Sequence, residues 1–115
     1  MFAKKITDIA LENLDNGEDI IKTAKRVLIS EKDGAPNFRM RYFTIEPGGH
    51  SPWHSHDWEH ENLFVKGKGL MVKEDEEIEL EPGMFAYVGP NEMHQYKNPY
   101  DETFEFICLI PVPKK

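Results

Sequence analysis

The 115-residue chain lacks the features that mark several common classes of protein. It has one cysteine, Cys108, so no disulfide can form within the chain and the fold needs no oxidising compartment. Basic residues number only 14 against 21 acidic ones, and no segment gathers enough lysine or arginine to neutralise a row of phosphates. Nucleic acid and anionic membranes are therefore not expected as partners.

Long apolar runs are also missing from the sequence. Met1-Phe2-Ala3-Lys4-Lys5 is followed by the polar residues Thr7 and Asp8, so we expect neither the apolar core of a signal peptide nor a membrane-spanning segment. A chain of this length suits one domain, which hides roughly two thirds of the surface of its unfolded chain. The sequence predicts a cytoplasmic protein with one core.

Most of the chain consists of short apolar segments separated by glycine and proline. Residues alternate with a period of two from Phe38 to Ile45, which is typical of a strand with two distinct faces, and Pro47-Gly48-Gly49 is expected to close it. Further strands are predicted at Arg26–Ile29, Leu63–Lys66, Leu70–Lys73, Ile78–Leu80, Met84–Val88, His94–Lys97 and Phe104–Ile110. This succession of short strands predicts an all-β sandwich or barrel.

Residues 1–26 lack this regular alternation of short apolar segments with glycine and proline. Their scattered apolar residues, such as Ile6 and Leu14, keep no continuous helical pattern, and we assign an N-terminal arm of undetermined structure before a β domain at 27–115. An arm without a core of its own needs a surface to cover, and an open barrel edge invites strand pairing. We therefore predict a homodimer built from the arm and from Val27–Ile29.

Four of the five histidines have a spacing that suits metal ligands. His54 and His56 are two residues apart, so on a strand their rings point to one face. His60 follows shortly after, and His94 comes after Pro90-Asn91-Glu92, a predicted turn that brings another strand alongside. Several converging imidazole nitrogens bind a divalent ion without any thiolate. The alternative is a group of surface histidines in a polar loop.

These histidines and the nearby glycines resemble the two motifs of the cupin superfamily. The first motif is matched by Gly48, His54, His56, His60 and Gly67, and the second by Gly83, Gly89, Asn91, His94 and Asn98. His60 stands where the commoner pattern has glutamate, and an alternative alignment uses Glu61 at a spacing off by one residue on each side. Gly89 replaces the usual proline and Asn91 the usual glycine. The similarity covers about Val27 to Pro111 and is greatest to small manganese-type cupins with a four-histidine metal site.

The resemblance implies a double-stranded β-helix, or jelly-roll barrel, that binds one divalent metal ion. The implied ligands are His54, His56, His60 and His94. The resemblance favours manganese, although iron, nickel, zinc or copper also suits a nitrogen-only site. Glu59 and Glu61 are candidate partners for the ring N–H groups of the ligands, or else solvent-facing charges. Four neutral imidazoles leave the charge of the ion uncompensated, so a bound water or anion should be held tightly.

Aromatic residues and the cysteine are candidates for a pocket beside the metal. Phe104, Phe106 and Cys108 share one face of the last predicted strand, so Cys108 approaches the pocket if that face looks inward. Otherwise it is a small buried apolar residue. Trp58 either lines a substrate entrance or packs at the rim. His50 matches no motif position and is expected at the surface or rim.

An octahedral ion with four protein nitrogens keeps two positions open, and open positions are typical of catalytic metals. We therefore expect a metalloenzyme with oxygen-dependent, dioxygenase-like chemistry on a small organic substrate. The alternative is a non-catalytic module that binds or senses a small ligand through a metal anchor. The resemblance permits both functions, because one fold supports many of them.

Overall fold

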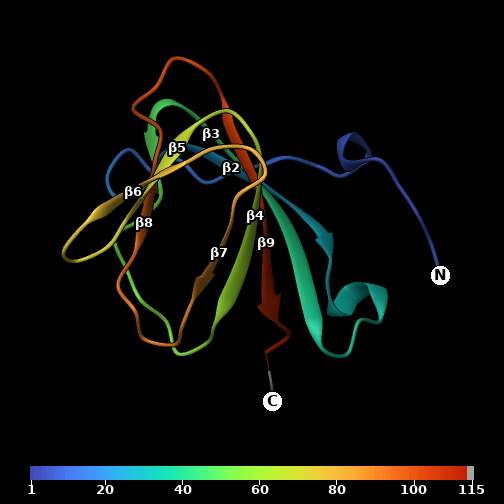
Figure 1. Ribbon diagram of the computed structural model, residues 1–115. Helices are drawn as coiled ribbons and strands as arrows, with labels where there is room; N and C mark the ends of the chain where they lie inside the picture. Colours follow the sequence, from blue (N-terminus) through green and yellow to red (C-terminus); the bar gives the residue numbers. More distant parts are fainter. Residues whose placement is uncertain (114–115) are drawn as a thin grey trace.

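The computed structural model describes residues 1–113, which form a continuous sheet curled into a barrel with two facing halves (Figure 1). The strand order is β6-β5-β8-β3-β9-β4-β7, β2 pairs with β3 and with the short β1, and all pairs are antiparallel. The strands are β1 (Glu12–Asn13), β2 (Ile21–Ile29), β3 (Phe38–His50), β4 (His60–Lys66), β5 (Gly69–Val72), β6 (Glu77–Leu80), β7 (Phe85–Val88), β8 (Gln95–Lys97) and β9 (Phe104–Pro111). The predicted all-β fold is confirmed.

In the described part of the chain, residues 1–113, helical structure is limited to two single turns of 3-10 helix, η1 (Ile6–Asp8) and η2 (Glu31–Asp33). Within residues 1–113, no helix has the length and apolar character needed to cross a bilayer. Residues 1–11 are almost entirely exposed and extend away from the barrel (Figure 1).

Strand β3 connects the two halves of the barrel. It pairs with β9 as far as Ile45 and with β8 at His50. The expectation that Pro47-Gly48-Gly49 closes this strand is wrong, because the register with β2 shifts there and the extra residues form a bulge. Gly48 has a φ of 85°, a conformation that glycine adopts without a steric penalty.

Two other strands are longer than local sequence predicted. β2 begins at Ile21 and not at Arg26, so part of the segment assigned to the arm belongs to the barrel wall. β4 begins at His60 and not at Leu63. In both cases the neighbouring strand supplies hydrogen-bond partners beyond the apolar run, and pairing sets the strand length.

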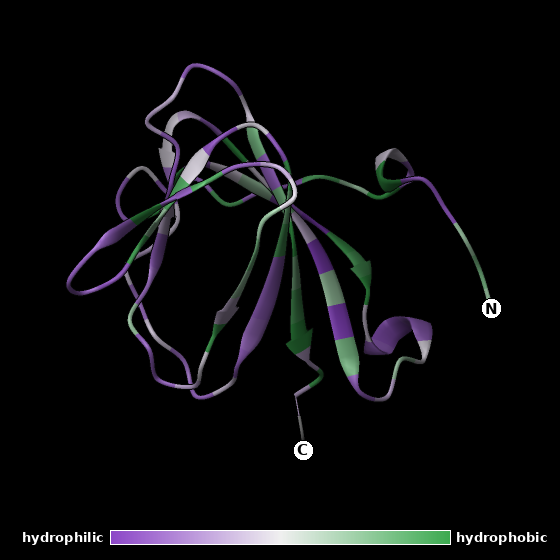
Figure 2. Cartoon of the chain, in the orientation of Figure 1, coloured by the Kyte–Doolittle hydropathy of each residue, from purple (hydrophilic) through white to green (hydrophobic). Residues whose placement is uncertain are grey.

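The faces of β9 and β3 determine what enters the barrel. Four residues of β9 point inward and are buried: Phe104, Phe106, Cys108 and Ile110. The register places Phe43 of β3 opposite Phe106 and Arg41 opposite Cys108, on the same inner face. Phe38 points outward and is 71% exposed. The inner face of β3 therefore contains both arginine and apolar residues. Figure 2 shows how hydrophilic and hydrophobic residues alternate along this strand.

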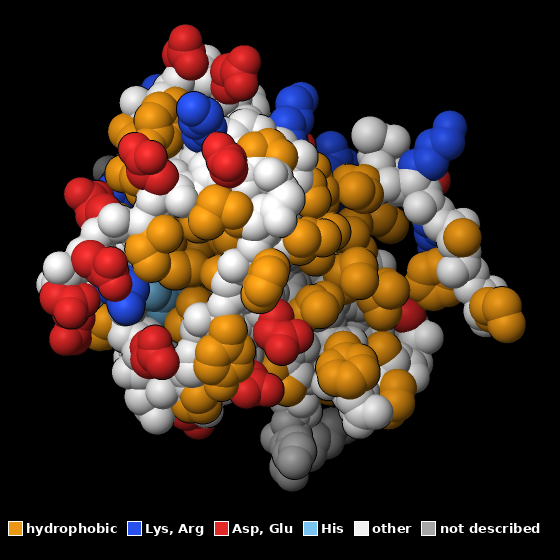
Figure 3. All heavy atoms as spheres, viewed as in Figure 1, with side chains coloured by type: hydrophobic (Ala, Val, Ile, Leu, Met, Phe, Trp, Pro, Cys, Tyr) orange, Lys and Arg blue, Asp and Glu red, His pale blue; other side chains and the backbone are white. Residues whose placement is uncertain are grey.

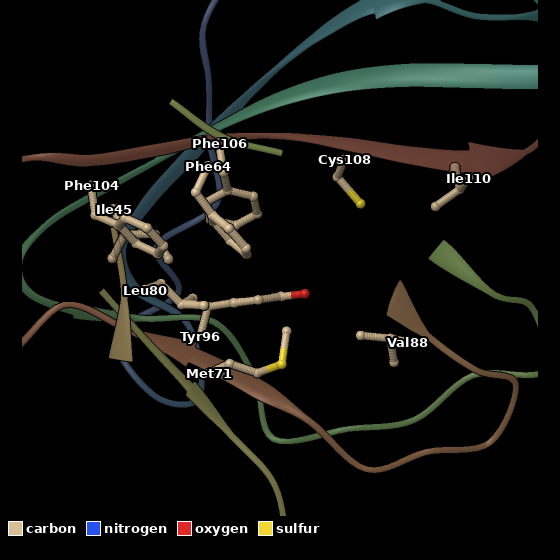
Figure 4. Packing of buried hydrophobic residues seen from close by; sticks show 10 residues of the cluster. All are labelled: Ile45, Phe64, Met71, Leu80, Val88, Tyr96, Phe104, Phe106, Cys108 and Ile110. Carbon is tan, nitrogen blue, oxygen red and sulfur yellow. The ribbon is translucent and has the colours of Figure 1, made fainter. Parts of the chain in front are cut away.

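The core lies between the two halves of the barrel. Phe64 of β4 is fully buried, and its ring centroid lies 5.8 Å from that of Phe104 and 5.6 Å from that of Phe106. Met71, Leu80 and Tyr96 face these rings from β5, β6 and β8 (Figure 4). The Tyr96 hydroxyl points out of the aromatic cluster towards the side where Cys108 lies (Figure 4).

We predict that Phe64→Ala lowers the free energy of unfolding by about 3–5 kcal/mol, because it leaves a cavity between aromatic rings that cannot collapse. Phe85→Ala on the adjacent strand β7 is the matched control, since Phe85 is 82% exposed in the single chain and its loss should cost less than about 0.5 kcal/mol at a protein concentration too low for association. Urea unfolding followed by circular dichroism measures both. Equal losses would contradict this assignment of the core.

Candidate metal centre

The predicted ligands come from loops and from the start of a strand. His54 and His56 lie in the loop between β3 and β4, His60 is the first residue of β4, and His94 immediately precedes β8. The expectation that His54 and His56 share one strand face is wrong, because His54 makes only an isolated β-bridge and no strand forms there. Their rings converge for a different reason.

Backbone hydrogen bonds join the two loops that carry these residues. His54 N donates to His94 O at 3.2 Å, and His94 N donates to His54 O at 3.0 Å. Asn91 N donates to His56 O at 2.7 Å. Asn91 has a φ of 66°, in the left-handed region that asparagine tolerates in turns, so the predicted turn at Pro90-Asn91 is confirmed. The main chain thus sets the spacing of these three histidines.

Backbone carbonyls orient two of the rings. His56 Nδ1 lies 2.9 Å from Trp58 O, and His94 Nδ1 lies 2.8 Å from Glu92 O. Because a carbonyl oxygen only accepts, both Nδ1 atoms carry the proton and both Nε2 atoms keep a lone pair. The His56 ring also stacks on Trp58, with a centroid distance of 4.4 Å and an interplanar angle of 4°.

The four rings meet around one point. Ring nitrogens of His54, His56 and His94 all lie within 4.8 Å of one another. His60 Nε2 lies 3.1 Å from His94 Nε2, and the ring centroids of His60 and His56 are 5.1 Å apart. The other nitrogen of His60, Nδ1, lies 3.5 Å from Cys108 Sγ.

Burial keeps three of these histidines, His54, His60 and His94, neutral. Burial first, and then the neighbouring His94, lower the pKa of His54 to about 4 and that of His60 to about 3. Burial also lowers the pKa of His94. A neutral imidazole is the form that binds a metal ion.

This donor set fits a transition metal ion. The Nε2 lone pair of His94 faces Nε2 of His60 at 3.1 Å, and only a proton or a cation between two such nitrogens makes that distance favourable. Neutral imidazoles are ligands for zinc, copper, iron and nickel. Three converging histidines are also sufficient protein ligands for a catalytic metal that keeps an open position.

A cavity of about 220 Å³ adjoins the histidines. Its walls include the aromatic side chains of Phe43, Trp58, Tyr96 and Phe106. Leu14 and Ile20, in the loop between β1 and β2, also line it, so residues of the predicted arm contribute to the site. The cavity accepts a small organic molecule beside the ring nitrogens.

Glu59 and Glu61 do not join the cluster. The Tyr87 hydroxyl donates to Glu59 Oε2 at 3.0 Å, and Glu61 lies on the exposed face of β4 while His60 points inward. Neither carboxylate bonds to a histidine ring within residues 1–113. The ring N–H groups of His56 and His94 instead donate to backbone carbonyls. The sequence does not reveal such partners, because every residue has a backbone carbonyl.

The other predicted site residues divide between cavity and core. Trp58, Phe106 and Cys108 line the cavity, whereas Phe104 is buried in the core away from it. His50 lies outside the cavity lining, with Nδ1 at 3.0 Å from Ser51 O.

Sequence reasoning missed three residues at the site: Arg41, Asn62 and Tyr96. Arg41 lines the cavity and donates through Nη2 to Cys108 Sγ at 3.0 Å. The Tyr96 hydroxyl donates to Asn62 Oδ1, and burial raises the pKa of Tyr96 well above 10. The alternation along β3 pairs Arg41 with Phe43 on one face, but alternation does not say which face looks inward.

Comparison with known proteins supports the fold. The sequence model of the family described as cupin domain matches residues 41–110. The chain is 30% identical over 71 residues to the 1-methylthio-D-xylulose 5-phosphate methylsulfurylase of Rhodospirillum rubrum, covering 62% of this chain and 46% of that protein. It is 31% identical over 114 residues to the glucose-6-phosphate isomerase of Thermococcus litoralis, covering 85% of this chain and 58% of that protein. The chain spans about half the length of these two relatives.

Solved structures are similar over nearly the whole chain. The polyketide cyclase RemF of Streptomyces resistomycificus has a TM-score of 0.91 and 29% identity, covering 98% of this chain and 80% of its own. A predicted oxalate decarboxylase of Thermotoga maritima has a TM-score of 0.86 and 16% identity, covering 97% of this chain and 100% of its own. The second likeness shows the fold alone, and together they confirm the jelly-roll barrel.

The lowered pKa values predict that the metal-free protein loses stability in mild acid. Above about pH 6.5 the histidines are neutral in both states. Below it His60 binds a proton in the unfolded chain but stays neutral in the folded protein down to its pKa of about 3. Proton binding therefore favours the unfolded state, and the free energy of unfolding falls as pH drops from about 6.5 to 4. His54 adds less because part of its ring is exposed.

Urea unfolding of metal-free protein at pH 7.5, 6 and 5 measures this dependence. His60→Gln should flatten the decline, and the matched control His50→Gln should leave it unchanged. A His60→Gln variant with the full acid sensitivity would contradict the assignment.

Proposed function

This chain belongs to the cupin domain family, and we propose that it is a metal-dependent enzyme that transforms a small organic molecule in the cavity beside the histidines. One observation carries the proposal: ring nitrogens of His54, His56 and His94 converge within 4.8 Å next to that cavity. Carbonyl partners orient the lone pairs of His56 and His94 before any ion binds.

His60 is the fourth ligand in this proposal. Its ring is 3% exposed and directed at His94, whereas Glu61, the alternative ligand, points to the other side of β4. An ion held by these four nitrogens would keep open positions for substrate, water or oxygen. The resemblance to manganese-type cupins favours manganese, and iron, nickel, zinc and copper also suit the nitrogen set.

Such an ion would act as a Lewis acid on a substrate oxygen, or would bind oxygen beside the substrate. The chain itself orients and shields the substrate. Phe43, Phe106 and Trp58 offer apolar walls, and Tyr96 keeps its proton at neutral pH because burial raises its pKa. The Tyr96 hydroxyl donates its single proton to Asn62 Oδ1, so its oxygen offers the substrate a hydrogen-bond acceptor.

Two reaction classes compete within this proposal. Isomerisation, ring closure or a related rearrangement without net oxidation is supported by the names of similar proteins, an isomerase and a cyclase. The oxygen-dependent, dioxygenase-like reaction expected from the sequence is supported by the aromatic cavity and by open metal positions. An oxygen electrode separates them, because only the second reaction consumes oxygen in step with substrate. A metal-loaded protein that binds ligands but never turns them over would instead be a sensing module.

Loss of a hydrogen-bond partner of a metal ligand weakens metal binding by roughly 10–100-fold. We predict that Gln substitutions at the four histidines weaken it more, because each removes a ligand itself. The substitutions are His54→Gln, His56→Gln, His60→Gln and His94→Gln. Chelator competition with manganese, iron, nickel and zinc in turn measures affinity. The matched controls Glu61→Gln and His50→Gln should retain the metal, and loss of metal in Glu61→Gln but not His60→Gln would reverse the assignment.

We also propose that the protein forms a homodimer through the arm and the edge of β2 around Val27–Ile29. β1 pairs with Lys25 and Ala24, and within residues 1–113 no strand pairs with the β2 edge at Val27–Ile29 opposite β3. Leu63 and Phe85, both exposed, are paired across β4 and β7. Figure 3 shows hydrophobic side chains gathered on the face of the barrel in this view. Such a surface favours association with a second copy.

Sedimentation equilibrium at micromolar concentration should give twice the chain mass of 13.4 kDa. Removal of residues 1–11, which contribute no buried side chain, should weaken the dimer without unfolding the barrel. A mass of one chain for the intact protein would refute the dimer.

A further inference from the structure

The cavity beside the histidines contains positive charge and no acidic side chain. The chain carries a formal charge of -7, yet among residues 1–113 no aspartate or glutamate lines this cavity, and Arg41 and Lys25 do. Both cations come from the inner faces of β3 and β2. A metal ion at the four neutral imidazoles would add more positive charge. A partly buried site of this kind is stabilised by a bound anion.

Arg41 lacks the partners that a half-buried guanidinium normally has. Its only hydrogen bond within residues 1–113 runs from Nη2 to Cys108 Sγ at 3.0 Å. Its Nε is buried without any partner, and its guanidinium carbon lies 4.9 Å from the centroid of the Phe43 ring. A guanidinium has five N–H donors, so most of the donors of Arg41 have no partner in the described chain.

Arg39, two residues away on the same face of β3, shows the ordinary arrangement. Its Nε donates to Glu31 Oε1 at 2.8 Å, and its Nη2 donates to Glu31 Oε2. This bidentate pair satisfies Arg39 with a carboxylate of the protein. Arg41 has no such carboxylate within ion-pair distance among residues 1–113. The two arginines therefore differ in whether the protein supplies the anion.

Arg41 is also connected to the metal-binding rings. Its Nη2 contacts Cys108 Sγ, which lies 3.5 Å from His60 Nδ1.

We propose that Arg41 binds an oxyanion of the substrate, a carboxylate or a phosphate ester. Arg41 and the metal would then hold one small molecule between them. Calling this molecule the substrate rests on the function proposed above. The anion site itself does not, because Arg41 and the cavity are present in the metal-free protein. A planar guanidinium matches both oxyanions, and Lys25 adds charge at the same cavity.

The test uses three ligands that fit an aromatic cavity and differ in charge: benzoate, its neutral isostere benzamide, and phenyl phosphate. Calorimetry on metal-free protein should show saturable binding of at least one anion and weaker binding of benzamide. The preferred anion distinguishes a carboxylate from a phosphate substrate. Equal affinity for benzoate and benzamide combined with no binding of phenyl phosphate, or no binding of either anion, would overturn the proposal.

Arg41→Gln should weaken binding of the preferred anion by about tenfold or more, because a charged hydrogen bond is lost. Arg39→Gln is the matched control and should bind as the native protein does. Arg41→Lys keeps the charge without the planar fork, so its affinity should fall between the two, and it replaces Arg41→Gln if that variant does not fold. Unchanged affinity in both Arg41 variants, or an equal loss in Arg39→Gln, would refute the role of Arg41.

These measurements separate this proposal from the metal enzyme. Anion binding that depends on Arg41 in a protein that retains no metal would support the anion site and refute the proposed enzyme. Metal retention and turnover with no effect of Arg41→Gln on anion binding would refute the anion site alone.

Discussion

The main-chain pairing of His54 with His94 is the constraint on which the site depends. Two reciprocal hydrogen bonds hold together loops that are 40 residues apart in sequence, and a third, from Asn91 to His56, extends the contact. Without them His54 and His56 would belong to an irregular loop with no defined relation to β8. With them, the ring nitrogens face one point, and the ordering cost of the ligands is met during folding.

Neutrality of the rings follows from the same arrangement. Burial against the aromatic core keeps His60 and His94 unprotonated, and the carbonyls of Trp58 and Glu92 direct the lone pairs of His56 and His94 inward. Carboxylates play no part in this orientation. The absence of acidic side chains from the cavity leaves charge balance to whatever ligand enters it, which is why the placement of Arg41 bears on substrate class.

The barrel also explains how one strand serves both core and site. β3 exchanges β9 for β8 as partner at the bulge around Gly48, and its inner face presents Ile45 and Phe43 to the core and Arg41 to the cavity. Its outer face, with Phe38 exposed, is the more apolar of the two. An apolar face that remains outside is unusual for a strand in an isolated domain and is consistent with a surface covered by association.

Sequence by itself determined the all-β class and most strand positions, and it selected four histidines as candidate ligands, because alternation, turn residues and histidine spacing are local signals. It did not determine that His54 and His56 leave the strand, that Gly48 lies in a bulge, or that β2 reaches back to Ile21, since each depends on pairing with a distant segment. Only the tertiary structure decided which face of β3 looks inward. A period of two shows that a strand has two different faces, but packing against other strands decides which face is buried. Arg41 is therefore recognised as a site residue only in the folded barrel.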